Sequence, residues 1–247
     1  MRGIVDDLPL MDWLQNHIWP LEQKWMSEAY VKDGTDLAIA EMIRGGTTCF
    51  NDMYFFPDIT AQQAIQNGIR ASVGLIVIDF STVWAENSAA YIAKGLDVHD
   101  QFRHQPLITT SFAPHAPYTV SDQPLQEIRT YADELDIPIT MHVHETLHEV
   151  EQAQANTGQR PLQRLHKLGL LNPSFIAVHM TQLTAEELTL VAESGAHIVH
   201  CPESNLKLAS GFCPVALCLS AGINVALGTD GAASNNDLDM MGEMRTA

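Results

Sequence analysis

Several short apolar runs in the second half of this 247-residue sequence are followed at once by residues that bind metals or transfer protons. The polar groups that follow them are His142-Val143-His144-Glu145, His179, His200 and Gly228-Thr229-Asp230-Gly231. Short apolar runs bounded by turn residues are typical of the buried strands of a parallel sheet. Because the carboxyl ends of parallel strands meet at one edge, we expect these side chains to form a single site.

Seven strand-like runs recur along the chain, at residues 47–51, 72–78, 107–113, 139–142, 176–179, 198–201 and 225–229. Helical patterns cover residues 10–26, 36–44, 125–135, 159–168, 185–194 and 238–247. This alternation predicts an α/β fold, and polar residues at the strand ends favour a (β/α)₈ TIM barrel. Seven strands are one short of closure, so we expect a barrel that lacks its first strand and is truncated at both ends. A complete α/β protein that is not a barrel is the alternative.

Side chains alternate between the two faces of a strand, and this alternation predicts which residues face the site. Within residues 139–145 the apolar side chains share one face, and Thr140, His142 and His144 share the other. In two later strands the small or polar face ends in His179 or in Asp230. We therefore expect the large apolar residues to pack on outer helices, while the polar face points to the barrel axis.

Composition limits the classes of partner. Hydrophobic residues make up 46% of the chain, enough for one large core, so we expect a single domain over residues 1–247. The net charge of −17 argues against a nucleic-acid or anionic membrane partner.

The four cysteines show no CxxC spacing and lie in or beside apolar segments, which favours buried, reduced thiols and a cytoplasmic location. We expect no signal peptide and no membrane-spanning segment.

Several separated motifs, taken in order, resemble the amidohydrolase superfamily. They are His142-x-x-Glu145-Thr146, Ala177-Val178-His179, His200-Cys201-Pro202-x-Ser204-Asn205 and Gly228-Thr229-Asp230-Gly231. Two further segments are similar to the branch that deaminates 5-methylthioadenosine, S-adenosylhomocysteine and related purines, namely Trp19-Pro20-Leu21-Glu22 and Ser111-Phe112-Ala113-Pro114-His115-Ala116-Pro117-Tyr118. The resemblance implies a metal-dependent hydrolase that removes ammonia from an adenine nucleoside.

The resemblance also implies roles for individual residues. His142 and Asp230 are the expected metal ligands, and zinc, iron or manganese would suit them. Asp230 is also expected to take a proton from the attacking water, and Glu145 to move protons to and from a ring nitrogen of the substrate. His179 is expected to hydrogen-bond the attacking hydroxide or the departing group, and to stabilise the developing oxyanion.

Two more residues are expected to contact the substrate. His115 resembles a substrate-binding histidine, and Glu22 resembles a carboxylate that accepts hydrogen bonds from ribose hydroxyls. His144 and His148 are interpreted as bystanders. The neighbourhood of His200 and Asn205 leaves a supporting role and a purely structural one equally open.

One departure from the family leaves alternatives open. The family's first strand carries a His-x-His metal motif, and the first histidine of this sequence is His17. We therefore expect this chain alone to bind metal weakly and to be inactive, and a metal-poor fragment is one alternative. Deamination or dechlorination of an s-triazine, or deamination of a guanine-like base, are the others. A small-molecule nucleoside is the expected partner, and a homo-oligomer is compatible with the sequence.

Overall fold

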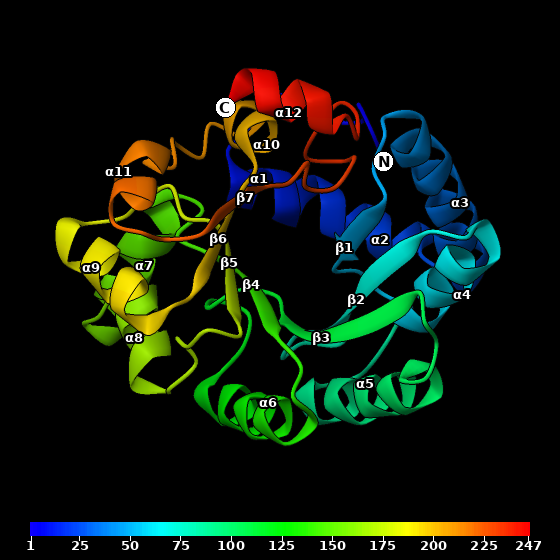
Figure 1. Cartoon of the computed structure of the whole chain (residues 1–247), viewed down its shortest axis with the longest axis horizontal. Helices are drawn as coiled ribbons and strands as arrows, with labels where there is room; N and C mark the ends of the chain where they lie inside the picture. Colours follow the sequence, from blue (N-terminus) through cyan, green and yellow to red (C-terminus); the bar gives the residue numbers. More distant parts are fainter.

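A computed structural model describes all residues from 1 to 247, and its centre is one parallel sheet. The sheet has seven strands in chain order, each paired with the next. They are β1 (Cys49–Asp52), β2 (Arg70–Val77), β3 (Ile108–Pro114), β4 (Ile139–Val143), β5 (Phe175–His179), β6 (His197–His200) and β7 (Val225–Leu227). The sheet curls strongly, but β1 and β7 do not pair, so the barrel is open on one side (Figure 1).

Most helices lie along the outside of the curled sheet, and the N-terminal ones cross one end of it (Figure 1). They are α1 (Leu10–Trp13), the π-helical turn η1 (Leu14–Ile18), α2 (Trp19–Trp25), α3 (Glu28–Arg44), α4 (Pro57–Asn67), α5 (Ser88–Phe102), α6 (Asp122–Leu135), α7 (Leu147–Thr157), α8 (Pro161–Lys167), α9 (Ala185–Ser194), α10 (Pro202–Lys207), α11 (Val215–Ser220) and α12 (Met240–Thr246). Several begin at a side-chain cap: Asn87, Thr146 and Thr184 each accept an N–H from the first turn of the helix that follows.

The main core fills the layer between the sheet and these helices. It contains 40 buried residues, and its large members include Phe112 on β3, Met141 on β4 and Phe175 on β5. The apolar face expected for residues 139–145 therefore does pack outward. Burying these side chains is the main stabilising term for such a layer, at about 25 cal/mol per Å² of apolar surface.

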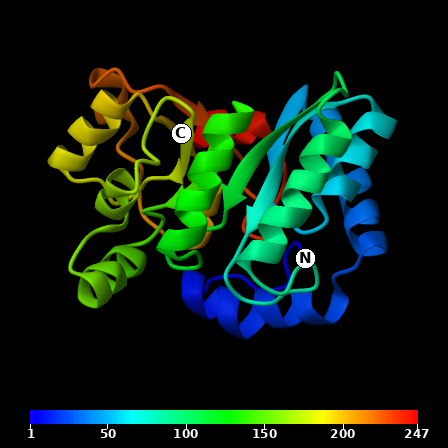
Figure 2. The ribbon, with the colours of Figure 1, turned by 90° about the horizontal axis from the view of Figure 1, so that it is seen from below.

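The N-terminal helices cross the carboxyl ends of the strands. Trp19 on α2 packs against Phe80, just after β2, with ring centroids 5.5 Å apart. Glu22 on the same helix accepts a hydrogen bond from Tyr54, just after β1. Figure 2 shows the helices, in dark blue, on the side toward which the strand arrows point. They therefore cover the end of the sheet where the predicted site residues lie.

The predicted fold is confirmed in class and in the position of all seven strands, and the predicted C-terminal helix corresponds to α12. Two details differ. The helix predicted at 36–44 begins earlier, at Glu28, because Ser27 caps it by accepting the N–H of Tyr30. Cys49 is exposed rather than buried, because it lies on the edge strand β1, which has a neighbouring strand on one side only, whereas the other three cysteines are buried.

No helix in the structure has the length and apolar character needed to cross a membrane.

Two glycines give a test of this packing. Gly74 on β2 lies where an added Cβ would be 2.3 Å from the Asp52 carbonyl oxygen and 2.9 Å from the Ala113 Cβ. Gly74→Ala should therefore lower the free energy of unfolding by about 1–3 kcal/mol, through overpacking. Gly34 on α3 has open space around its Cα, and Gly34→Ala should raise stability by up to about 1 kcal/mol. Chemical denaturation measures both, and a Gly74→Ala protein as stable as the wild type would contradict this description of the β1–β2–β3 layer.

Candidate metal and active site

His142 ends β4 with one ring nitrogen already occupied. Its Nδ1 lies 2.7 Å from the carbonyl oxygen of His115, and a carbonyl only accepts, so the proton is on Nδ1. In this tautomer the lone pair of Nε2 is available to bind a cation. A metal-ligating histidine almost always has its other nitrogen fixed in this way.

His179 ends β5 and is fixed by a side chain from α10. Its Nδ1 lies 2.9 Å from the amide oxygen of Asn205, and the amide nitrogen of Asn205 lies 3.4 Å from Nδ1 of His200. The sequence left a supporting and a structural role equally open for His200 and Asn205. In the structure Asn205 orients His179 directly, and His200 contacts Asn205. Burial lowers the pKa of His179, so the neutral ring is favoured.

Asp230 follows β7 and is held by two hydroxyl groups. Ser204 and Ser234 both donate to its Oδ2. Burial alone would raise the pKa of Asp230, but His179, His142 and these hydroxyls outweigh it and hold the pKa below its ordinary value. Asp230 is therefore present as a carboxylate, the form that binds cations.

These three side chains meet in one place. One ligand atom from each of His142, His179 and Asp230 lies within 4.8 Å of the others. Two imidazole nitrogens and one carboxylate oxygen are ligands that zinc and other divalent first-row metals accept. The tautomer of His142 and the ionised state of Asp230 both suit a cation, so these residues fit a metal. His179, expected as a hydrogen-bonding group, lies as close to the cluster as the two expected ligands do.

Glu145 lies beside this cluster, on the loop between β4 and α7. Its Oε2 is 3.7 Å from Nε2 of His179, and its side chain is buried. Burial raises the pKa of Glu145 to about 8, although the neighbouring His142 lowers it. A carboxyl group that keeps its proton near neutral pH can act as a general acid.

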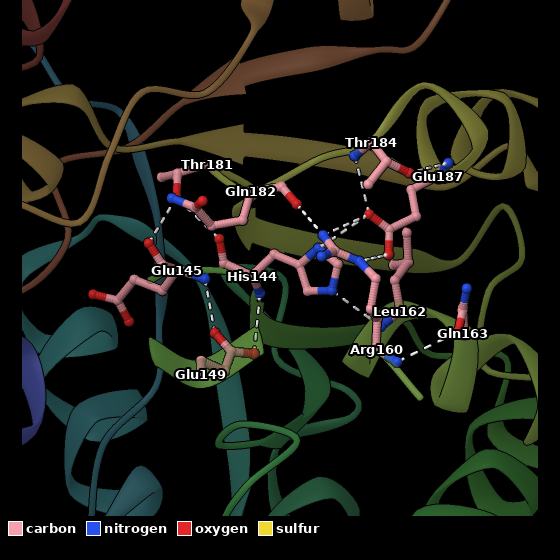
Figure 3. Close-up of polar contacts among 10 residues, drawn as sticks. All are labelled: His144, Glu145, Glu149, Arg160, Leu162, Gln163, Thr181, Gln182, Thr184 and Glu187. Atoms are coloured by element: carbon pink, nitrogen blue, oxygen red, sulfur yellow. Dashed lines mark hydrogen bonds and ion pairs between the residues drawn. The ribbon is translucent and has the colours of Figure 1, made fainter. Parts of the chain in front are cut away.

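His144 does not share the face of His142, contrary to the strand alternation. Its backbone φ is +53°, in the left-handed region, so the alternation breaks where β4 ends. Figure 3 shows its ring pointing toward Arg160 and Glu187, while Glu145 points the other way. The ring Nε2 of His144 accepts the N–H of Leu162. The interpretation of His144 as a bystander to the metal cluster therefore agrees with its position, and His148 is exposed.

The two expected substrate residues lie around this cluster at different distances. The carbonyl oxygen of His115 accepts a hydrogen bond from Nδ1 of His142, and the two ring centroids lie 5.2 Å apart. Burial lowers the pKa of His115 to about 3, so the ring is neutral. Glu22 has no hydrogen bond or ion pair with the cluster. Its Oε1 is 2.7 Å from the hydroxyl of Tyr54, and burial raises its pKa.

A groove lies on the same side of the sheet, with a volume of about 690 Å³. It is lined in part by Phe80, which packs on Trp19 of the helix that carries Glu22. Tyr118 also lines it and packs edge-on against His115. The groove therefore borders neighbours of both expected substrate residues, although neither Glu22 nor His115 lines it.

Sequence reasoning missed the residues that fix the loop after β7. Asn235 donates to the carbonyl oxygen of Thr229 at 2.8 Å and to the carboxylate of Glu243 at 2.7 Å. Glu243 is fully buried, although it lies in the last helix of the chain. A buried glutamate at position 243 could not be foreseen, because its partner comes from a loop and its helix is short.

Known proteins match this chain over its whole length. The 5-methylthioadenosine/S-adenosylhomocysteine deaminase of Saccharophagus degradans is 55% identical over 246 residues, which are 100% of this chain and 55% of that protein. The crystal structure of an adenosine deaminase from Xanthomonas campestris with bound zinc is 58% identical, with a TM-score of 0.97 over 99% of this chain and 56% of that one. A guanine deaminase from C. acetobutylicum with bound guanine is 25% identical, with a TM-score of 0.90 over 100% of this chain and 61% of that one.

The chain thus spans 55% to 61% of the length of these relatives. The site described above brings histidines near the ends of two parallel strands together with an aspartate after a third. A model of the amidohydrolase family matches residues 1–247, and the chain therefore belongs to the amidohydrolase family.

Proposed function

We propose that the protein carrying this sequence is a metal-dependent deaminase of adenine nucleosides, with 5-methylthioadenosine or S-adenosylhomocysteine as substrate. The observation that carries the proposal is the meeting of His142, His179 and Asp230 beside the buried acid Glu145. The names of the similar proteins support the substrate class. The free thiols of the cysteines suit a cytoplasmic enzyme.

His142 and Asp230 would hold the metal, with Nε2 of His142 and a carboxylate oxygen of Asp230 as ligand atoms. We propose zinc, because this nitrogen and oxygen ligand set suits it and a similar structure contains it. When bound, zinc would lower the pKa of a water molecule and so supply a nucleophile at neutral pH.

The proton transfers follow from the two carboxyl groups. Asp230, which is ionised, accepts a proton from the attacking water. Glu145, which keeps its proton near neutral pH, donates it to the ring nitrogen beside the carbon that carries the amino group. The water oxygen bonds to that carbon, the C–N bond breaks, and the amino group leaves as ammonia after taking the proton held by Asp230. The hydroxyl group left on the carbon gives its proton to Glu145, which restores the acid and leaves a neutral carbonyl product. General acid–base steps of this kind each contribute about 10² to 10⁴-fold to the rate.

His179 is proposed to orient the attacking water. Its own proton is on Nδ1, toward Asn205, so its Nε2 accepts a hydrogen bond rather than donating one. This differs from the oxyanion role expected from the sequence, which needs a proton on Nε2. Because Asn205 holds the ring proton on Nδ1, His179 is proposed to position the attacking water.

Glu22 and His115 are proposed to bind the nucleoside. The second carboxylate oxygen of Glu22 is free to accept hydrogen bonds from ribose hydroxyls, while Tyr54 holds the first. A guanine-like free base remains the second candidate, because a guanine deaminase is among the similar structures. Glu22 discriminates between the two, since a free base has no ribose for it to bind.

Replacing Glu145 tests the acid role. In the complete natural polypeptide that carries this sequence, Glu145→Gln should lower kcat for 5-methylthioadenosine by at least about 10²-fold, because glutamine cannot transfer the proton. Metal content should stay near normal, since Glu145 is not proposed as a ligand. Absorbance change on deamination and metal analysis measure the two effects. The exposed Glu151→Gln is the control, and a Glu145→Gln enzyme with normal kcat would rule out this role.

Replacing Glu22 tests the substrate class. Glu22→Ala should raise KM for a nucleoside, because the lost acceptor costs about 1–3 kcal/mol if the ribose hydroxyls stay unpaired. Its effect on adenine or guanine as free bases should be small. Steady-state kinetics on both kinds of substrate measure this, with the exposed Glu28→Ala as the control. Equal loss on nucleoside and free base would contradict the ribose assignment.

A further inference from the structure

A second buried glutamate holds the backbone of the proposed acid Glu145. The two carboxylate oxygens of Glu149, on α7, accept hydrogen bonds from two consecutive backbone N–H groups (Figure 3). The distances are 3.1 Å from the nitrogen of His144 and 2.8 Å from that of Glu145. Glu149 is buried and has no ion pair with a lysine or arginine. Burial raises the pKa of Glu149 to about 8, and the two backbone N–H groups oppose that shift because they stabilise the ionised form. Both oxygens of Glu149 are therefore committed to this one stretch of backbone.

These bonds go beyond ordinary helix capping. Thr146 caps α7 by accepting the N–H of Glu149, which gives the Thr-x-x-Glu pattern of a capping box. In such a box the glutamate returns to the N–H of the capping residue, as Glu187 does for Thr184 at 3.1 Å. Glu149 instead reaches the two residues before its cap. Its additional partners are the residues that set the direction of the Glu145 side chain.

The opposite side of the same segment is held from β5. The hydroxyl of Thr181 lies 2.8 Å from the carbonyl oxygen of Glu145. Gln182 donates to that hydroxyl oxygen at 2.8 Å, which leaves the Thr181 proton directed toward its acceptors. Thr181 follows His179 by two residues, so one segment holds both His179 and the backbone of Glu145.

This backbone needs such support because of its conformation. His144 has φ of +53°, and a left-handed residue other than glycine is disfavoured. The turn sends the His144 ring toward Arg160 and Glu187 and the Glu145 side chain the other way (Figure 3). The Glu145 carboxyl group thereby lies 3.7 Å from Nε2 of His179. Without its partners the segment would be free to return to extended backbone, and the Glu145 carboxyl would move away from His179.

We infer that Glu149 is a positioning residue for Glu145, and that Thr181 fixes the same backbone through the carbonyl oxygen of Glu145. The inference rests on the proposed function, since it treats Glu145 as the acid of a deaminase. Glu149 touches no reacting atom and acts only through the two backbone N–H groups. Its loss should therefore lower kcat more than it changes KM, because proton transfer from Glu145 takes place in the transition state.

Glu149→Gln is the direct test, carried out in the complete, metal-loaded enzyme. Glutamine keeps the volume but has one acceptor oxygen, so one of the two N–H groups would face an amide N–H₂. We expect kcat for 5-methylthioadenosine to fall about 10²-fold, as for a catalytic group displaced by about 1 Å. KM and zinc content should change little. Hydrogen exchange at the amides of residues 144 and 145 should become faster.

Glu187→Gln is the matched control. Glu187 is also a buried glutamate three residues after a capping threonine, but its carboxylate binds Thr184 and Arg160. It lies 3.8 Å from the ring Nδ1 of His144 and makes no hydrogen bond to the 144–145 backbone. It should lose thermal stability without slower turnover and without faster exchange at residues 144 and 145. If both variants lost the same activity, stability alone would explain the loss and the inference would be wrong.

Thr181 gives an independent check with conservative substitutions. Thr181→Ser keeps the hydroxyl and should keep kcat, whereas Thr181→Val keeps the shape and should lose activity.

Normal kcat and normal exchange in Glu149→Gln would overturn the inference. Failure of the unmodified enzyme to deaminate any adenine nucleoside would overturn the proposed function instead, and exchange would still report whether Glu149 holds this backbone.

Discussion

The site depends on left-handed backbone at the ends of three parallel strands. His144 follows β4, His179 and Met180 end β5, and Asp230 follows β7, all with positive φ. Each such residue costs about 1–2 kcal/mol relative to ordinary backbone, so the fold must hold it with specific bonds. The N–H of Met180 donates to the carbonyl of Val143 at 3.1 Å, which ties the ends of β4 and β5 together. This tie fixes His179 relative to the segment that carries Glu145.

The two carboxyl groups of the proposed reaction have different surroundings, and these surroundings move their pKa values apart. Asp230 accepts hydrogen bonds from the hydroxyls of Ser204 and Ser234 and faces two imidazoles, and together these groups keep its pKa low. Glu145 lies in a buried position where desolvation raises its pKa to about 8. Two carboxyl groups in one site thus favour opposite protonation states, the arrangement that general acid–base chemistry requires. Because the ordinary pKa values of Asp and Glu are similar, the difference in protonation between Asp230 and Glu145 comes from their surroundings.

The sequence predicted the parts of this architecture that repeat along the chain. Apolar runs at regular intervals fixed the positions of the seven strands, and the polar residues after them predicted the meeting of His142, His179 and Asp230. Alternation failed at His144, because a left-handed residue ends the strand pattern and reverses the direction of its side chain. Asn205 and Glu243 act through contacts with distant segments, and Glu149 acts through hydrogen bonds with the backbone four and five residues earlier. Such contacts leave no periodic signal, although the Thr146-x-x-Glu149 pattern marked where one of them begins.

Anomalous diffraction at the zinc edge, on crystals of the complete zinc-loaded enzyme, tests the central claim most directly. The account predicts one strong peak about 2.0–2.2 Å from Nε2 of His142 and from a carboxylate oxygen of Asp230. Glu145 should lie outside bonding distance of that peak, with its carboxyl directed toward His179. A peak bonded to Glu145, or one away from both His142 and Asp230, would contradict the account.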